Sequence, residues 1–189
     1  MANEAEKTLH EMQQVLTIDA NGVYETEEDK AELLWHELQN AYRSKRILSG
    51  VLSGVEETSS GSIAVVYYKG QRMIIPVSEM ELNLSEQNGY GEMKGRQVRI
   101  LNNMVGCEID FILIALDDTA RSVVASRRLA MLAKRRKFYF PNENGNAQIT
   151  EGRVVQARVI AVAEKVVRLE VFGAECAVPA RDIAWEWVG

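Results

Sequence analysis

The stretch DDTARSVVASRR, residues 117–128, decides the fold of this chain because it closes a run of short strands that begins near Arg46. It places a carboxylate, an arginine and then a basic pair around the last strand of that run. Alternating apolar residues and glycine-containing turns predict the strands upstream. The predicted strands are 47–56, 62–68, 71–76, 98–101, 107–116 and 122–125. The sequence therefore predicts a mainly β domain over residues 46–130, and residues 78–95 are expected to form an irregular connection.

Residues 1–45 are predicted to be helical and strongly acidic. Thr26 and Asp29 have the spacing of a capping box, which marks the start of a helix. One side of that helix is predicted to be apolar, with Ala31, Leu34, Trp35, Leu38 and Tyr42 at helical spacing. Two interpretations stay open: the Trp35 face packs against the following domain, or it is a surface for a partner.

A second copy of the strand pattern follows the β domain. Residues 127–137 are predicted to form a basic helix, and the polar residues 142–147 a linker. Strands are then expected at 151–159, 166–172 and 176–183, where CAVPARDI repeats MIIPVSEM of residues 73–80. The predicted organisation is an acidic helical segment (1–45), a β domain (46–130), a basic helix and linker (131–150) and a truncated second repeat (151–189).

The charge of the chain is distributed unevenly. The net charge is −5, yet residues 1–42 contain ten acidic and two basic side chains, whereas residues 121–140 contain seven basic side chains and no acidic one. A local basic patch binds polyanions even in an acidic protein. Three roles stay open for the basic run: contacts with phosphate, a solvated helix face, or an intramolecular partner for the acidic segment.

Several classes of function find no support in the sequence. It shows no nucleophile with a suitably spaced histidine, no cluster of metal ligands and no phosphate-binding loop, so we expect no enzyme activity, no cofactor and no small-molecule substrate. Cys107 and Cys176 are far apart in apolar patterns and are predicted to be buried free thiols. No apolar run is long enough to span a bilayer and the amino terminus has no apolar leader, so we expect a cytoplasmic protein without a membrane partner.

Residues 46–130 resemble the S-one type RNA-binding domain, the repeat named after the largest protein of the small ribosomal subunit. The resemblance lies in a glycine-punctuated first strand, a second strand closed by a glycine turn, a third strand ending in IPVSEM, and a last strand of the form D-x-x-x-R-x-V-x-x-S-R. It implies a five-stranded OB-fold barrel that holds single-stranded RNA on strands two and three. Residues 151–189 resemble a partial second copy. The implied partners are single-stranded RNA and, through it, the ribosome or a messenger RNA.

The resemblance also implies an RNA site, in which the stacking platform is depleted. The usual stacking aromatic corresponds to Val65 and, in the second copy, Arg168, so Tyr67 and Phe172 are the candidate replacement rings. The implied RNA-binding residues are Val65, Tyr67, Lys69, Arg72, Pro76, Asp117, Arg121, Arg127, Arg128, Lys165, Arg168 and Phe172. The implied phosphate patch is Lys134, Arg135, Arg136 and Lys137.

Other roles for these residues stay open. The two rings would otherwise cover strand edges, and Asp117 with Arg121 would form a local ion pair. The competing function is a protein-interaction adaptor that uses the barrels and the Trp35 face.

Overall fold

The structure is a computed structural model that describes residues 26–59, 61–82, 90–163 and 165–183. The chain divides into two units, Met1–His36 and Glu37–Gly189. Residues 1–25 of the predicted helical segment lie outside the described residues. More of the described residues lie in strands than in helices.

Helix α2 (Glu27–Ser44) begins where the capping box predicts. The hydroxyl of Thr26 accepts a hydrogen bond from the Asp29 amide at 3.1 Å, and the Asp29 carboxylate accepts one from the Thr26 amide at 3.0 Å. This reciprocal pair satisfies two of the amides that a helix start leaves without partners. In the second unit, Leu38 and Ala41 of this helix are buried. In the first unit, Ala31 is exposed, contrary to its predicted place on the apolar face.

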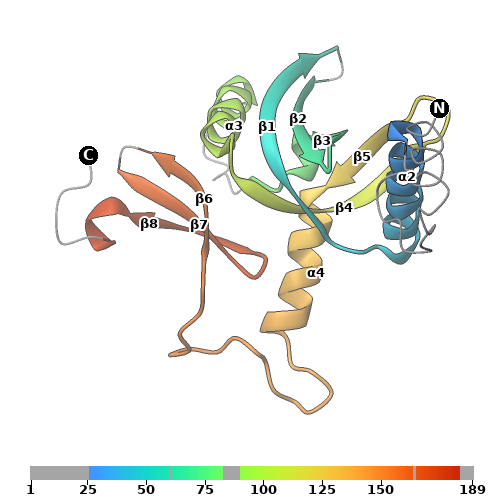
Figure 1. The fold of residues 1–189 in the computed structure, drawn as a ribbon. Helices are drawn as coiled ribbons and strands as arrows, with labels where there is room; N and C mark the ends of the chain where they lie inside the picture. The colour runs from blue at the N-terminus through green and yellow to red at the C-terminus, as the bar shows by residue number, and fades with distance from the viewer. Residues whose placement is uncertain (1–25, 60, 83–89, 164, 184–189) are drawn as a thin grey trace, which may run out of the picture. The chain divides into compact units, whose positions relative to one another are not determined.

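Five strands of the second unit form a sheet that closes in a ring (Figure 1). They are β1 (Leu48–Thr58), β2 (Gly61–Tyr68), β3 (Gln71–Pro76), β4 (Glu108–Asp117) and β5 (Ser122–Ser126). Their order is β1-β2-β3-β5-β4, and β4 pairs back onto β1. All pairs are antiparallel except β3 with β5. The predicted strands in these five places are confirmed.

Alternate residues of every strand point into the ring, and these inward residues are apolar. The fully buried side chains include Leu52, Ala64, Val66, Met73, Ile75, Ile109, Phe111 and Leu113. Gly50 is required where β1 passes close to its neighbours, since a Cβ there would lie 2.7 Å from the Tyr67 carbonyl oxygen. A bulge between Leu52 and Gly54 interrupts the β1–β2 register, and such a bulge bends a strand.

The connection between β3 and β4 differs from its prediction. A 3₁₀ turn, η1 (Val77–Glu79), follows β3, and residues 83–89 lie outside the described residues. Helix α3 (Tyr90–Met104) follows. It covers the last part of the predicted irregular connection and the whole of the strand predicted at 98–101, so both predictions were wrong over these residues. Leu101 and Met104 are buried at helical spacing. The apolar run at 98–101 that led to the strand prediction is too short for its periodicity to separate a helix from a strand.

Helix α4 (Arg127–Tyr139) follows β5 directly and confirms the predicted basic helix. The Ser126 hydroxyl caps it by accepting a hydrogen bond from the Leu129 amide at 3.1 Å. The described residues 142–147 contain neither helix nor strand, as predicted for a linker. No helix within the described ranges combines the length and apolarity that crossing a membrane requires.

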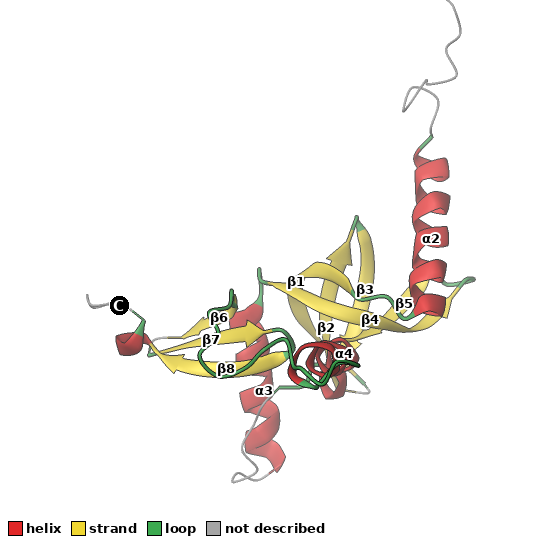
Figure 2. Cartoon of the chain, turned by 90° about the horizontal axis from the view of Figure 1, so that it is seen from below, coloured by secondary structure: helices red, strands yellow, loops and turns green. Residues whose placement is uncertain are grey.

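A separate antiparallel sheet follows, with the order β6-β7-β8 (Figure 2). Its strands are β6 (Arg158–Ala163), β7 (Val166–Val171) and β8 (Ala174–Pro179), and the 3₁₀ turn η2 (Ala180–Asp182) comes next. The second predicted strand of the repeat is therefore confirmed, and the third is confirmed only as far as Pro179, because residues 180–182 form η2. The first was wrong over 151–157, which has no strand; the strand begins only at Arg158.

The two sets of three strands repeat each other in register. Ile63 pairs with Pro76, and Val166 pairs with Pro179, so residues of β2–β3 and β7–β8 correspond with an offset of 103 (166 − 63 and 179 − 76). The β2–β3 and β7–β8 hairpins each turn through two residues with positive φ, Lys69-Gly70 and Phe172-Gly173. The bulge in β6, between Val159 and Ala161, corresponds in register to the bulge in β1 between Leu52 and Gly54. This correspondence assigns every residue of β6–β8 a counterpart in the ring.

Candidate nucleic-acid interface

The outer face of β1, β2 and β3 presents an exposed aromatic ring at Tyr67. Tyr67 is 45% exposed and lies in register between Val51 of β1 and Arg72 of β3. The Arg72 guanidinium donates a hydrogen bond to Glu56 at 2.6 Å. An exposed ring beside an apolar residue and a guanidinium is a surface on which a nucleic-acid base can stack.

Val65, at the position of the expected family aromatic, offers no such surface. It is only 4% exposed, although it lies on the same outer face two residues before Tyr67. Pro76 is half-buried at the end of β3. On β2 the face therefore presents one exposed ring, and the inclusion of Val65 among the RNA-binding residues is not supported by its burial.

Lys69, in the turn after β2, is engaged by helix α2. Its ammonium group donates to Glu37 at 2.7 Å, and the Tyr68 hydroxyl donates to the same carboxylate at 2.8 Å. The hydrogen bond from Lys69, followed by that from Tyr68, holds the pKa of Glu37 below its usual range. The same contact raises the pKa of Lys69, so the charge of Lys69 is retained but neutralised by its neighbour.

Asp117 and Arg121 flank the turn between β4 and β5. The Asp117 carboxylate accepts hydrogen bonds from the amides of Thr119 and Ala120, both at 2.9 Å, and so shapes the turn. Arg121 is exposed with a positive φ, and its carbonyl accepts a hydrogen bond from Gln71 at 3.2 Å. Asp117 therefore has a structural role at the rim, whichever ligand the rim meets.

Most of the predicted basic patch on α4 is neutralised within the molecule. Arg127 is fully buried and lies 3.4 Å from Glu175 and 3.9 Å from Glu170. Three further cations of the patch are paired at their charged ends: Arg128 with Glu79 at 2.9 Å, Lys134 with Glu170 at 2.6 Å and Asp110, and Arg135 with Glu81 at 2.6 Å. A phosphate contact by any of these four would require one of these pairs to break.

Asp110 lies at the centre of this network of charges. It accepts hydrogen bonds from Lys134, from Ser49 at 2.6 Å and from Arg158 at 2.9 Å. Burial by itself would raise the pKa of Asp110, but these hydrogen bonds outweigh it and hold the pKa below its usual range. Asp110 therefore remains ionised and ties β4 and α4 to β6.

The second sheet uses its corresponding face for the same network. Arg158, Glu170 and Glu175 all belong to one face, the counterpart of the Tyr67 face in the ring. Arg168 on this face pairs with Glu175 at 2.7 Å. The Phe172 ring lies in the β7–β8 turn, 4.5 Å from the Phe138 ring of α4, and Lys165 remains exposed. The structure thus directs Arg168 and Phe172 toward intramolecular contacts rather than toward a ligand.

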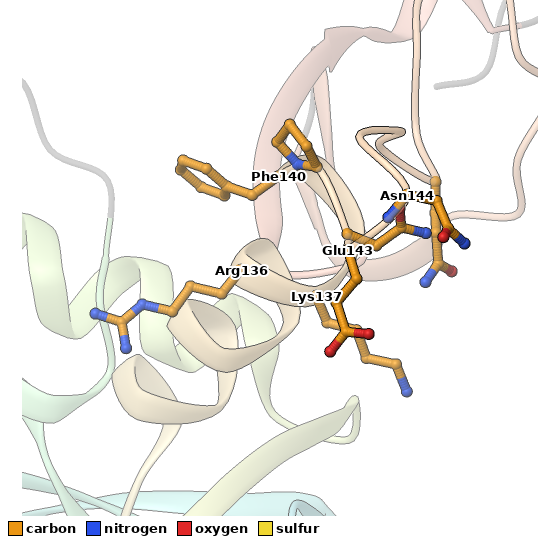
Figure 3. A pocket seen from close by; sticks show the side chains of 8 residues that line it. Arg136, Lys137, Phe140, Glu143 and Asn144 are labelled. Atoms are coloured by element: carbon orange, nitrogen blue, oxygen red, sulfur yellow. The ribbon is translucent and has the colours of Figure 1, made fainter.

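The end of α4 keeps two exposed cations beside an exposed ring. Arg136, Lys137 and Phe140 line an open hollow of about 430 Å³ together with Pro141, Asn142, Glu143, Asn144 and Gln148 (Figure 3). Phe140 is 61% exposed. Neither Arg136 nor Lys137 forms an ion pair with a carboxylate of the described residues, which distinguishes them from the other four cations of α4. Lys137 instead lies over the Phe138 ring, 5.4 Å from its centroid.

Phe140 was not among the residues predicted for the site. The available signal was a large aromatic residue immediately after a basic run and before a proline. The partners of the other cations gave no comparable signal, because Asp110, Glu170 and Glu175 are far from α4 along the chain.

No protein-family model matches this chain, and no curated protein matches it. Its function is therefore inferred from its geometry. Within the described part of the chain, no group of three or more His, Cys, Asp or Glu side chains is arranged to hold a metal ion. Cys107 and Cys176 are both free, as predicted, but their predicted burial was wrong: Cys107 is half-buried and Cys176 is exposed.

Proposed function

We propose that this protein binds single-stranded RNA and that its ring of strands is an OB-fold of the S-one type. The ring order β1-β2-β3-β5-β4 and the in-register repeat of its first three strands support this assignment. Because a fold does not determine a function, the proposal depends on the surface that the fold presents.

The observation that carries the proposal is the exposure of Tyr67 on the outer face of β2, in register with Arg72. This is the face on which S-one type domains are expected to hold RNA. A base stacked on Tyr67 would place its sugar-phosphate within reach of a guanidinium that is already at the surface. Stacking tolerates any base, so the proposed binding has little sequence preference.

Phosphate contacts are assigned to fewer residues than the basic composition of α4 indicates. Four of the six cations of this helix neutralise buried or half-buried carboxylates, which leaves Arg136 and Lys137 beside Phe140 as the cationic surface of the helix. We infer modest affinity, with the second repeat contributing little through the face that corresponds to Tyr67.

Replacing Tyr67 by leucine is expected to weaken binding of an unstructured RNA oligonucleotide by about 5- to 150-fold, because stacking on one ring is worth about 1–3 kcal/mol. Tyr67→Phe is the matched control, since it keeps the ring and loses only the hydroxyl. Fluorescence polarisation at fixed salt measures both variants, with an RNA hairpin stem as a duplex comparison. Equal affinity of all three proteins, or equal affinity for stem and single strand, would refute the proposal.

The salt dependence of binding tests the hollow at the end of α4. Arg136→Gln with Lys137→Gln is expected to reduce the slope of log affinity against log salt by about 1.4, or about 0.7 for each phosphate contact on a single strand. Arg43→Gln with Arg99→Gln removes the same charge from exposed positions on α2 and α3 and serves as the control. Equal slopes for the two double variants would exclude Arg136 and Lys137 as phosphate contacts.

The adaptor alternative gains no support from helix α2. Leu38, on its predicted partner face, is fully buried in the second unit. Glu37 of the same helix binds Lys69 and the Tyr68 hydroxyl. This part of the helix is therefore engaged with the ring rather than available to a partner.

A further inference from the structure

The register of the ring places one cross-strand row of exposed side chains on its outer face. From β3 to β4 the row consists of Arg72, Tyr67, Val51 and Glu108, each paired with the next. We call these four residues the outer row. All four are exposed, whereas Val65, on the same face of β2, is buried. The outer row is therefore a continuous exposed track across four strands.

A residue of the second sheet reaches the β4 end of the outer row. The Arg158 guanidinium of β6 donates a hydrogen bond to Asp110 at 2.9 Å, and its Nη2 lies 3.6 Å from the Glu108 carboxylate. Glu108 and Asp110 are two residues apart in β4, and Ile109 between them is buried in the ring interior. Because alternate residues of a strand share a face, Arg158 binds the outer face of the ring.

The Arg158 guanidinium is fixed at one edge and open at the other. Its Nη1 is held by Asp110, which also accepts hydrogen bonds from Ser49 and Lys134 and is therefore fixed itself. Its Nη2 donates no hydrogen bond to any described residue, and 3.6 Å from Glu108 is too long for one. The Arg158 side chain is 33% exposed. A cation positioned in this way before binding loses little freedom when it meets an anion.

A guanidinium thus lies at each end of an uncharged surface. Arg72 is at the β3 end and Arg158 at the β4 end, with Tyr67 and Val51 between them. The outer row spans three strand spacings, about 14 Å along the sheet. An OB-fold binds about 4–16 nucleotides, so a strand that stacks a base on Tyr67 is long enough to reach both ends. Guanidinium groups match the geometry of phosphate.

The carboxylates beside these two cations do not prevent a phosphate contact. Glu56 binds Arg72 and is 52% exposed, and Glu108 lies beside Arg158 and is 55% exposed. Exposed ion pairs contribute little to stability, so a phosphate can replace either carboxylate while that carboxylate turns to solvent.

We propose that Arg158 of the second sheet is a phosphate contact of the RNA site on the ring, so that a bound strand crosses from the ring to the second sheet. This inference rests on the proposed RNA binding and adds the residue through which the second repeat takes part. Because the strand then contacts both sheets, RNA binding and docking of the second sheet stabilise each other.

Arg158→Gln is expected to reduce the slope of log affinity against log salt by about 0.7, the value of one phosphate contact on a single strand. Fluorescence polarisation with an unstructured RNA oligonucleotide measures the slope. Arg168→Gln is the matched control, because Arg168 belongs to the same sheet but pairs with Glu175 rather than with the outer row. Amide exchange in β6–β8 reports whether the second sheet stays docked in both variants.

Glu108→Gln is a second test that leaves Arg158 and its bond to Asp110 in place. It removes the carboxylate that competes with phosphate for Nη2, so we expect RNA binding to strengthen. Glu151→Gln removes the same charge from an exposed position outside the outer row and should have a smaller effect. In the Arg158→Gln background the gain from Glu108→Gln should shrink, because the cation for which Glu108 competes is gone.

The proposal is overturned by an unchanged salt slope in Arg158→Gln or by an equal reduction in Arg168→Gln. Equal effects of Glu108→Gln and Glu151→Gln overturn it too, and this comparison decides alone if Arg158→Gln speeds amide exchange in β6–β8. Tyr67→Leu is measured beside these variants. Weak binding by Tyr67→Leu with a normal slope in Arg158→Gln refutes only the role of Arg158, whereas no saturable binding by the unmodified protein refutes the proposed RNA binding as well.

Discussion

Replacing Arg127 by methionine is expected to lower the free energy of unfolding by about 1–3 kcal/mol, because Glu170 and Glu175 each lose one of two cations and a buried carbonyl loses its hydrogen-bond donor. Glu170 and Glu175 both have side chains that are nearly inaccessible, and both lie within ion-pair distance of this guanidinium. Arg127 also donates a hydrogen bond to the Met80 carbonyl at 2.9 Å. Urea denaturation at neutral pH measures the loss.

A matched variant controls for the change of residue type. Arg136→Met makes the same substitution at an exposed position of the same helix and is expected to alter stability by no more than about 0.5 kcal/mol. An equal loss in Arg127→Met and Arg136→Met would show that the buried contacts of Arg127 do not stabilise the fold.

Most of the fold could be predicted because its signals are local. The ring strands alternate along the sequence, the hairpin turns contain glycine, and the start of α2 is marked by Thr26 and Asp29. Helix α3 could not be separated from a strand over 98–101, because four residues span about one helical turn and give little periodicity. Residues 151–157 contain valines suited to a strand, but Val154 is almost fully exposed and lies in no strand.

The candidate site was less predictable because the pairing and burial of its side chains depend on residues that are distant in the sequence. The basic run of α4 has the composition of a phosphate patch, but the acids that neutralise it come mainly from β4, η1, β7 and β8. Val65 shows the same limit, since an outward strand position does not reveal that its neighbours bury it. Tyr67, next on the same face, stayed exposed at its predicted outward position.

The two repeats therefore present different faces despite their common register. In the ring, the interior is filled and the outer face at Tyr67 is exposed. In the second sheet, the counterpart of the outer face is bound by Lys134 and Asp110, and Val159, Val162 and Cys176 of the counterpart of the interior are exposed. The two copies are therefore not equivalent, and the proposed stacking face for RNA belongs to the ring alone.

Gly173 is the residue at which the docking of the second sheet is most sensitive to a single methyl group. Its φ is +94°, and a Cβ would lie 2.3 Å from the Met131 carbonyl oxygen and 2.8 Å from the Lys134 Cβ. Gly173→Ala is expected to cost about 2–5 kcal/mol, from about 1–2 kcal/mol of left-handed backbone strain and about 1–3 kcal/mol of overpacking. Urea denaturation measures the total, and amide exchange in β7 and β8 reports whether the turn has moved away from α4.

The chain contains its own control for this experiment in the first repeat. Gly70 occupies the same turn position and has a φ of +87°, and beyond its chain neighbours no atom lies within 4 Å of the place that an added methyl group would take. Gly70→Ala therefore incurs the backbone strain alone, about 1–2 kcal/mol. The difference between the two variants isolates the contact of the β7–β8 turn with α4. Equal losses would show that this turn does not pack against the helix in solution, and the buried charge network would then lack the docking that holds it.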